Sequence, residues 1–497
     1  MPARPASPLP RTGLPKHSRL CHHGLALAAG PRPRRNQGYL HGRVMKQSLN
    51  QRPRLARRAG LACLAGLTVF LTLAFIPAWS GPALAEEPPL SLDELLELAG
   101  GRNPQVRQAL ANQEAARARV EQTASGFWPQ LSGQASWEAT RNEMTSSGEL
   151  EGQQRQAGLS LSQSLINIPL WGQTRAGRLE AEAYAWAVET ALNEVRAGVR
   201  GAYLDLLSAR AQLLVYEEQE RDTAAFLERA RKLLQHGLGT PLEVARASLD
   251  LAQAQGKVIE GKASARRLMA RLAEAVGVPQ VYGLPLAPWD RSPEAPIAAA
   301  LEQGEAGLVT RALKVRPEMV RLQRLTAAAQ ASLDAAEAGH WPTLDASAGL
   351  GQIGAHDLDS QYYSYGLALN LPLFTGFKLR ATSAERRALL KAAAETRDLM
   401  GLTVRRETQQ ALQGLLEAQA KVAVSHSLLA SASENYRLIK GRHQNGLATP
   451  LELSEARTQR FNAQAEVERS RYGVFSALSG LDRALGGGLF PAAGGRP

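Results

Sequence analysis

Of the 58 lysines and arginines in this 497-residue chain, 13 lie in residues 1–85, which contain no aspartate or glutamate, so the rest has 58 − 13 = 45 basic against 46 acidic residues. A net charge of −1 there excludes a chain that binds nucleic acid through an excess of positive charge. Both cysteines, Cys21 and Cys63, also lie in residues 1–85, which excludes disulfides and thiolate-bound metals from the rest.

Residues 1–85 are predicted to form an N-terminal extension followed by a signal peptide. An apolar run at 61–76, LACLAGLTVFLTLAFI, follows several arginines and precedes the small-x-small sequence Ala83-Leu84-Ala85, after which cleavage is expected. A leader of ordinary length begins at Met45, which we take as the true start. The alternative, a membrane-anchoring helix, is disfavoured because the run is shorter than the roughly 20 residues that span a bilayer. Cys63 stands at the start of the run and not at its end, which argues against a lipidated mature N-terminus.

Residues 86–276 form the first of two repeats. A helix leads to two strands, at about 131–140 and 157–166, in which apolar and polar residues alternate. Each strand has one apolar and one polar face, which suits a barrel wall between lipid and a water-filled lumen. An ordinary half-buried sheet has the same period, and this alternative stays open.

A very long helix follows the second strand. No proline occurs from Arg175 to His236, a stretch that measures roughly 93 Å as a helix at about 1.5 Å per residue. Apolar and small residues recur there at a spacing of three and four, the pattern of a coiled coil sustained over several heptads. The positions are Leu192, Val195, Val199, Ala202, Leu206, Ala209, Leu213 and Tyr216.

The sequence GLGTPLE at 237–243 is predicted to be the turn of a helical hairpin. Gly237 suits the left-handed position that ends a helix. Thr240 as the N-cap, the proline after it and Glu243 three residues after the cap fit a capping box. Turn chemistry accounts for these residues but not for Leu238, an apolar side chain at the tip that suggests a docking surface.

The second half of the chain repeats this order. The sequence GLATPLE at 446–452 differs from the first heptapeptide at one position, and the offset is 446 − 237 = 209 residues, which indicates an internal duplication. The predicted parts are a proline-rich linker at 277–297, a second repeat at 298–485 with strands at about 343–353 and 362–371, and a flexible tail at 486–497. Four strands cannot close a barrel with a lumen, so several chains would have to contribute.

No catalytic or metal-binding motif is found in the sequence. After residue 85, the histidines show no metal-ligand spacing with one another or with clustered carboxylates. There is also no phosphate-binding glycine loop and no GxSxG sequence. Neither an enzyme nor a cofactor-binding protein is therefore predicted.

In their order, these motifs resemble the TolC-like outer membrane efflux family (outer membrane factors), the exit ducts of Gram-negative export systems. The match spans nearly the whole chain after residue 85 and rests on the order and duplication of individually weak motifs. The matching residues are the entry Ser91-Leu92-Asp93-Glu94 through Asn103-Pro104, the corners Trp128-Pro129 and Trp341-Pro342, the corner Pro372-Leu373-Phe374-Thr375-Gly376, both GLxTPLE tips, and Ala484-Leu485-Gly486-Gly487-Gly488.

The resemblance implies a mainly α fold with a small β part, built from a duplicated unit of helix, two strands and a long helical hairpin. A homotrimer would form an α-helical coiled-coil barrel that extends into the periplasm and a twelve-stranded transmembrane β-barrel, four strands per chain, in the outer membrane. Such a duct would pass substrates outward from a periplasmic adaptor (membrane fusion) protein and an inner-membrane pump of the resistance-nodulation-division (RND) or ABC type. A type I protein-secretion duct of the same fold and a structural exported coiled coil are the alternatives, and the transported substrate stays open.

The resemblance also assigns roles to the two tips. Adaptor docking is expected at Gly237, Leu238, Gly239 and Thr240, and at Gly446, Leu447, Ala448 and Thr449. Acidic residues of the periplasmic entrance are expected at Glu243, Glu452 and Glu455, where three copies of each would form rings that favour cations. The alternative is that Glu243 and Glu452 only complete capping boxes and that Glu455 is a solvated helix residue.

Overall fold

The computed structural model describes residues 89–144, 148–289, 292–355 and 358–490. The predicted extension, the signal peptide and both cysteines lie outside the described residues. The described residues belong to one compact unit that starts at Pro82. Within these ranges, no helix is both long enough and apolar enough to cross a bilayer.

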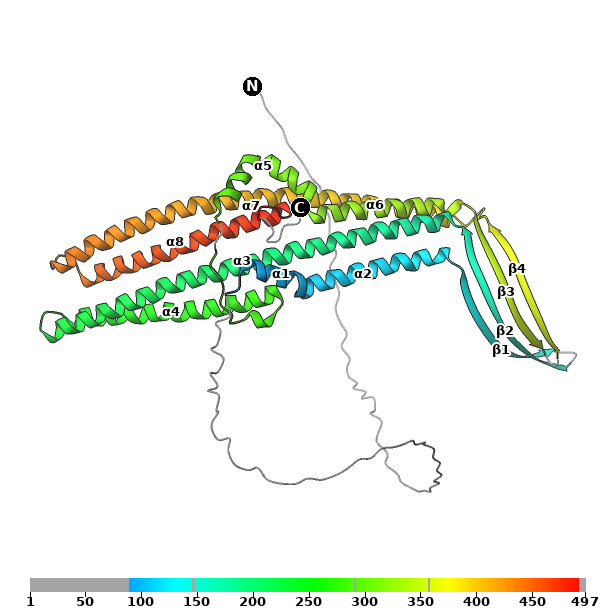
Figure 1. Ribbon diagram of the computed structural model, residues 1–497, viewed down its shortest axis with the longest axis horizontal. Coiled ribbons are helices and arrows are strands. Elements are labelled where there is room, and N and C mark those ends of the chain that lie inside the picture. The colour runs from blue at the N-terminus through cyan, green and yellow to red at the C-terminus, as the bar shows by residue number, and fades with distance from the viewer. Residues whose placement is uncertain (1–88, 145–147, 290–291, 356–357, 491–497) are drawn as a thin grey trace, which may run out of the picture. The chain divides into compact units, whose positions relative to one another are not determined.

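The first repeat runs from α1 to α4 (Figure 1). Helices α1 (Leu92–Arg102) and α2 (Pro104–Ala124) lead through the 3-10 turn η1 (Ser125–Phe127) to the strands β1 (Gln130–Met144) and β2 (Gly148–Ile166). The long helix α3 (Ile168–Gln235) and helix α4 (Pro241–Val276) then pack side by side as a hairpin.

The second repeat has the same order of elements. It consists of α5 (Glu294–Val315), α6 (Pro317–Glu337), the 3-10 turn η3 (Ala338–His340), β3 (Thr343–Ala355), β4 (Leu358–Asn370), α7 (Lys378–Gln444) and α8 (Pro450–Leu485), with the 3-10 turn η2 (Pro279–Val281) before it. Three pairs of corresponding helices match in length: 21 residues in α2 and α6, 36 in α4 and α8, and 68 and 67 in α3 and α7. The first helices differ, with 11 residues in α1 and 22 in α5. The internal duplication predicted from the sequence is present in the structure.

Each repeat ends at a glycine, which packs against the start of the second helix of the same repeat. Gly277, after α4, has a φ of 78°, and a Cβ there would lie 2.8 Å from the Cδ of Pro104. Gly486, after α8, has a φ of 84°, and a Cβ there would lie 3.1 Å from the Cα of Arg316. Since 486 − 277 = 209, these glycines keep the offset of the two heptapeptides. Both the left-handed backbone and the close approach require glycine.

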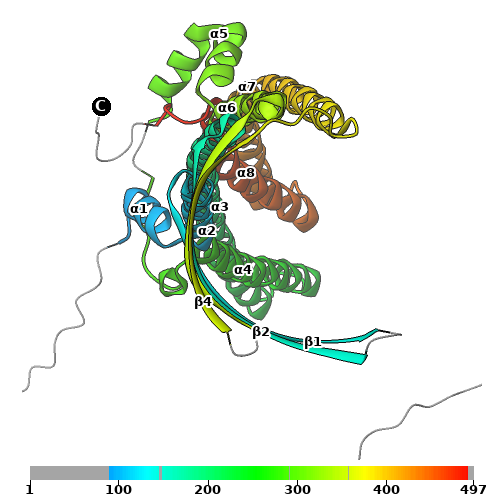
Figure 2. The same ribbon diagram turned by 90° about the vertical axis from the view of Figure 1, so that its right-hand side faces the viewer.

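The four strands form one antiparallel sheet in the order β1-β2-β3-β4, which is curved (Figure 2). They are longer than the predicted segments of about ten residues, at 15, 19, 13 and 13 residues. The register sets Leu159 beside Leu350 and Leu350 beside Tyr363 on one face. The alternation read in the sequence therefore gives one apolar and one polar face over the part of the sheet next to the helices. Farther from the helices the pattern is lost, since Arg155 and Gln352 lie on the apolar face and Ile353 lies on the polar face. At its edges, β1 and β4 each pair with a single strand.

The two largest apolar cores that hold the helices together belong one to each repeat. Val199 and Leu206, on the predicted coiled-coil positions of α3, are buried in a core with residues of α1 and α4, while Val404 and Leu415 of α7 are buried in a core with residues of α5 and α8. The two halves also meet directly, because α3 packs against both α6 and α8. The three-four spacing thus marks the faces on which the long helices pack.

Two predicted boundaries are wrong. The linker predicted at 277–297 ends too late, because α5 already begins at Glu294. Before α5, Val281 is buried and Leu90 pairs with Leu286. The tail predicted to be flexible from residue 486 is ordered as far as Phe490, which is buried in the core of the second repeat. Proline and glycine content indicated loops correctly, but it does not reveal whether the apolar residues between them find a core to enter.

Candidate functional site

The first hairpin tip is a tightly bonded turn between α3 and α4. Gly237 has a left-handed backbone (φ 72°), and the amide of Leu238 donates to the carbonyl of Leu233 (2.8 Å). This is the Schellman arrangement that ends helices at a glycine. The Oγ1 of Thr240 accepts from the amide of Glu243 (3.3 Å), while the Glu243 carboxylate accepts from the amide of Thr240 (3.0 Å). The predicted capping box is therefore formed.

The second tip, between α7 and α8, repeats this geometry with one addition. Gly446 also has a φ of 72°, and the amide of Leu447 donates to the carbonyl of Arg442 (2.8 Å). The Nη2 of Arg442 in turn donates to the carbonyl of Leu447 (2.9 Å), which ties the tip to the last turn of α7. The Glu452 carboxylate accepts from the amide (2.6 Å) and the hydroxyl (3.0 Å) of Thr449. Both tips are thus fixed by local hydrogen bonds.

The tips expose apolar side chains although local hydrogen bonds fix their backbones. Leu238 is 78% exposed and Leu447 is 67% exposed, as the docking prediction requires. Leu242 and Leu451, in the first turns of α4 and α8, are exposed as well and extend each apolar surface. These two leucines lie outside the predicted docking set. Their signal in the sequence was an apolar residue four positions after each tip leucine.

The tips differ in the residue between the leucine and the capping threonine. A Cβ on Gly239 would lie 3.0 Å from the amide nitrogen of Leu234, closer than nearly all real contacts allow without a shift. The second tip has Ala448 at this position, and its side chain is half-buried. The first turn is therefore packed more closely against its own helix than the second.

The three predicted entrance carboxylates have different surroundings. Those of Glu243 and Glu452 are engaged in capping, so the capping role weighed in the sequence analysis is present for both. Hydrogen bonds from the backbone and side chain of Thr449, with a smaller contribution from the charge of Arg442, lower the pKa of Glu452 below its usual value. Glu455 is exposed on the next turn of α8 and takes no part in the cap.

A buried ionic cluster joins the two hairpins beyond the tips. The side chain of Arg457 on α8 is only 4% exposed, and its Nε lies 3.3 Å from the Oδ2 of Asp222 on α3. Its Nη1 lies 4.0 Å from the Oδ2 of Asp250 on α4, and its guanidinium lies over the ring of Phe226, 4.0 Å from the ring centre. Asp250 also accepts from the hydroxyl of Ser454 (2.7 Å).

The cluster connects three helices through charged groups, of which Arg457 and Asp250 are buried and Asp222 is partly exposed. An unpaired buried charge is unfavourable by several kcal/mol, so a buried arginine fixes where its carboxylate partners must lie. These residues are not among those predicted from the sequence to have a role. The available signal was an arginine at position 457, among the buried positions Leu453, Ala456 and Phe461 of α8.

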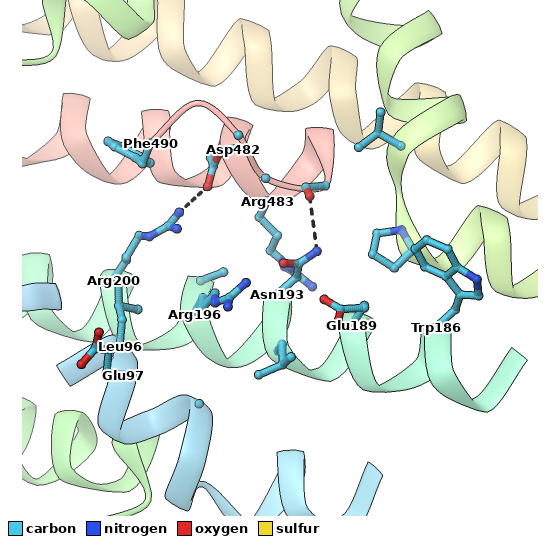
Figure 3. Close-up of a pocket in the computed structure, with 18 of the residues that line it drawn as sticks. Leu96, Glu97, Trp186, Glu189, Asn193, Arg196, Arg200, Asp482, Arg483 and Phe490 are labelled. Carbon is cyan, nitrogen blue, oxygen red and sulfur yellow. Dashed lines mark hydrogen bonds and ion pairs between the residues drawn. The ribbon is translucent and has the colours of Figure 1, made fainter. Parts of the chain in front are cut away.

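A hollow of about 1020 Å³ lies where α1, α3 and the segment after α8 meet (Figure 3). Arg200 forms an ion pair with Asp482, and its guanidinium lies 5.0 Å from the ring centre of Phe490. The side chain of Asn193 donates to the carbonyl of Gly486 (3.3 Å). These contacts fasten the C-terminal segment to α3, so we interpret this region as a structural joint. Across the described residues, no cluster of His, Cys, Asp and Glu is placed to hold a metal ion.

Comparison with known proteins identifies close matches in sequence. The outer membrane efflux protein family model matches residues 95–278 and 308–487. The pyoverdine export outer membrane protein OpmQ of Pseudomonas aeruginosa is 30% identical over 353 residues, which cover 67% of this chain and 70% of OpmQ. The toluene efflux pump outer membrane protein TtgI of Pseudomonas putida is 26% identical over 417 residues, covering 80% of this chain and 85% of TtgI.

Solved structures share the fold. The outer-membrane channel OprN superposes with a TM-score of 0.69 at 21% identity, covering 80% of this chain and 90% of OprN. The outer membrane protein VceC of Vibrio cholerae gives a TM-score of 0.67 at 19% identity, covering 80% of this chain and 97% of VceC. The predicted mainly α fold, the predicted role as the outer-membrane duct of an efflux system and the predicted resemblance are thereby confirmed. The chain belongs to the outer membrane efflux protein family.

Proposed function

We propose that three copies of this chain form one export duct, with the hairpin tips at its periplasmic end and the sheets in the outer membrane. The open edges at β1 and β4 support the trimer, since each leaves a row of backbone donors and acceptors for another strand. In lipid these groups must be satisfied within the protein. Three four-stranded sheets joined edge to edge would close as a twelve-stranded barrel, an even number typical of bacterial outer-membrane barrels.

The tips are the proposed docking surface for a periplasmic adaptor that links the duct to an RND or ABC pump. The observation that supports this most is the exposure of Leu238 and Leu447 on turns that hydrogen bonds hold in place. Leu242 and Leu451 enlarge the two apolar surfaces. Exposed apolar groups on an ordered turn mark a surface that another protein covers. Two tips per chain would give six in the trimer.

The acidic residues near the tips are proposed to favour cations at the entrance. Glu455 is the best placed for this role, because its carboxylate is exposed and does not serve the cap. Glu243 and Glu452 cap their helices at the same tips, so they would contribute to the same field. No catalytic step and no cofactor is assigned to the duct.

Small molecules are the proposed cargo. OpmQ is named for pyoverdine export and TtgI for toluene efflux, and both names describe small-molecule export. This favours small-molecule efflux over the type I secretion of a protein by the same fold. The particular solute would be set by the pump that delivers it.

Replacing both Leu238 and Leu447 with aspartate tests the docking surface. The double variant should fold and assemble, since solvated turn residues contribute little to stability. It should nevertheless lose export of a toxic solute in a strain that lacks the wild-type gene, because charge enters an apolar contact. Native mass measurement in detergent should give three chains for both proteins.

The control places new charges beside the tips and leaves the leucines intact. The pair Gln235→Glu and Gln444→Glu alters exposed residues at the ends of α3 and α7 and should still export. Normal export by the double leucine variant would show that the tips are turns without a docking role. A stable monomer of the wild type would contradict the trimer itself.

A further inference from the structure

Strand β4 carries tyrosines on both faces of the sheet, and their exposure differs. Tyr363 and its neighbour two positions on, Tyr365, are 85% and 87% exposed on the apolar face of the sheet. Tyr362 points to the polar face, yet it is half-buried. Its ring must therefore lie against the sheet, whereas an extended side chain would stand away from the wall.

Two glycines create the space for this ring. In the register, Tyr362 stands beside Gly351 of β3, which stands beside Gly158 of β2. A Cβ on Gly351 would lie 2.9 Å from the Cε1 of Tyr362, and a Cβ on Gly158 would lie 2.9 Å from its hydroxyl. Real Cβ atoms almost never approach so closely. The side chain of Gln156 donates to the hydroxyl (3.5 Å) at the far end of the ring.

The polar face around the ring carries mostly small or polar side chains, with Ile353 of β3 as an apolar exception. Ser132 and Ser160 share a hydrogen bond (2.7 Å) across β1 and β2, and Ser347, Gly349, Ser364 and Gly366 continue the face on β3 and β4. Among the described side chains of this face, Tyr362 is the one aromatic residue. Its position, together with that of Gln134 of β1 in the same row, therefore affects how far the wall projects at this level.

We propose that Gly158 and Gly351 form a seat that holds the Tyr362 ring flat against the wall, and that this seat keeps the passage open to bulky solutes at this level. The inference rests on the proposed trimer, in which the polar face lines the passage and the apolar face meets lipid. Each trimer has three such rings at one level. Displaced from their seats, they would point into the passage together and narrow it.

The variant Gly158→Ala tests the seat. Its new methyl group meets the tyrosine hydroxyl at 2.9 Å and the carbonyl of Leu350 at 3.1 Å, so the ring must move while the backbone yields by only a few tenths of an ångström. We expect trimers in planar bilayers to lose single-channel conductance and cells to lose efflux of a bulky solute more than of a small one. Adding Tyr362→Ala should restore both. The matched control, Gly366→Ala on the same face, has no neighbour closer than the Ser347 Oγ at 3.9 Å and should behave like wild type.

The outcomes separate this inference from the proposed duct. Wild-type trimers that conduct, together with an unchanged Gly158→Ala conductance, would overturn the seat and leave the duct intact. A low conductance that persists in the double variant would also overturn it. If Gly158→Ala does not assemble, Tyr362→Ala should restore assembly, and failure of that rescue would overturn the seat. Absence of any wild-type pore would instead reject the proposed duct.

Discussion

Replacing Arg457 with methionine should loosen the second hairpin from the first. The guanidinium lies between Asp222 (3.3 Å) and Asp250 (4.0 Å) and over the ring of Phe226. Methionine fills a similar volume and can still contact the ring. The substitution therefore removes the charge while leaving most of the packing in place.

The expected loss is about 3 kcal/mol. Removing one partner of a buried ion pair costs about 3–5 kcal/mol, because the other charge stays buried and uncompensated. The lower end applies because the Asp222 side chain is 37% exposed and is partly stabilised by water. Asp250 also keeps Arg246, whose Nε lies 3.6 Å from its Oδ1, and the hydroxyl of Ser454. A sulfur–aromatic contact with Phe226 would offset about 0.3–1.5 kcal/mol of the lost stacking.

Native-state hydrogen exchange of the trimer in detergent measures this loss locally. Amides of α8 near Arg457 exchange when the contacts between the hairpins open. A loss of about 3 kcal/mol in the free energy of this opening corresponds to roughly hundredfold faster exchange. Adding Asp250→Asn to Arg457→Met should cost less than the sum of the two single changes. A coupling of about 0.5–3 kcal/mol is expected for residues in one network.

Arg469→Met is the matched control on the same helix. Arg469 pairs with Glu466 (3.1 Å), but their side chains are 61% and 43% exposed, so less than about 1 kcal/mol is expected. Equal exchange rates near the substitution in the Arg457 and Arg469 variants would refute the reasoning. Strict additivity in the double variant would show that Arg457 and Asp250 do not act together.

Two further predictions concern the second tip. Because the folded pKa of Glu452 is lowered, its contribution to the α8 cap is present above its unfolded pKa and is lost as pH falls through the folded value. Pepsin cleavage at this tip, divided at each pH by the cleavage of an unfolded reference peptide, should therefore rise as the solution is acidified through the folded pKa. Glu452→Gln should lack this pH dependence, and an unchanged dependence in that variant would assign it to another group. Glu455→Gln should lower cation selectivity, measured as a reversal potential across a salt gradient, without increasing cleavage of the tip at neutral pH. An unaltered reversal potential would exclude Glu455 from the entrance field.

The sequence by itself determined the local structure and the repeat. The partners in both capping boxes lie three residues apart, as with Thr240 and Glu243, so residue type and spacing were enough to predict them. The same holds for the glycines that end α3 and α7, and for the three-four spacing of the long helices. The duplicated order of these local signals identified the fold and the family, because each signal depends only on neighbours along the chain.

Only the tertiary structure decided which distant residues meet. Asp250 and Ser454 are 204 positions apart, and Gln156 and Tyr362 are 206 apart, so nothing local indicates that either pair is in contact. The sequence alone indicated that Gly237 is a turn residue. It did not indicate that Gly158 leaves space for the ring of Tyr362, which comes from another strand. The tail to Phe490 looked flexible because its glycines precede two apolar residues whose burial depends on a core made by other helices. Such contacts depend on strand register and helix packing, which the whole fold sets and no short segment encodes.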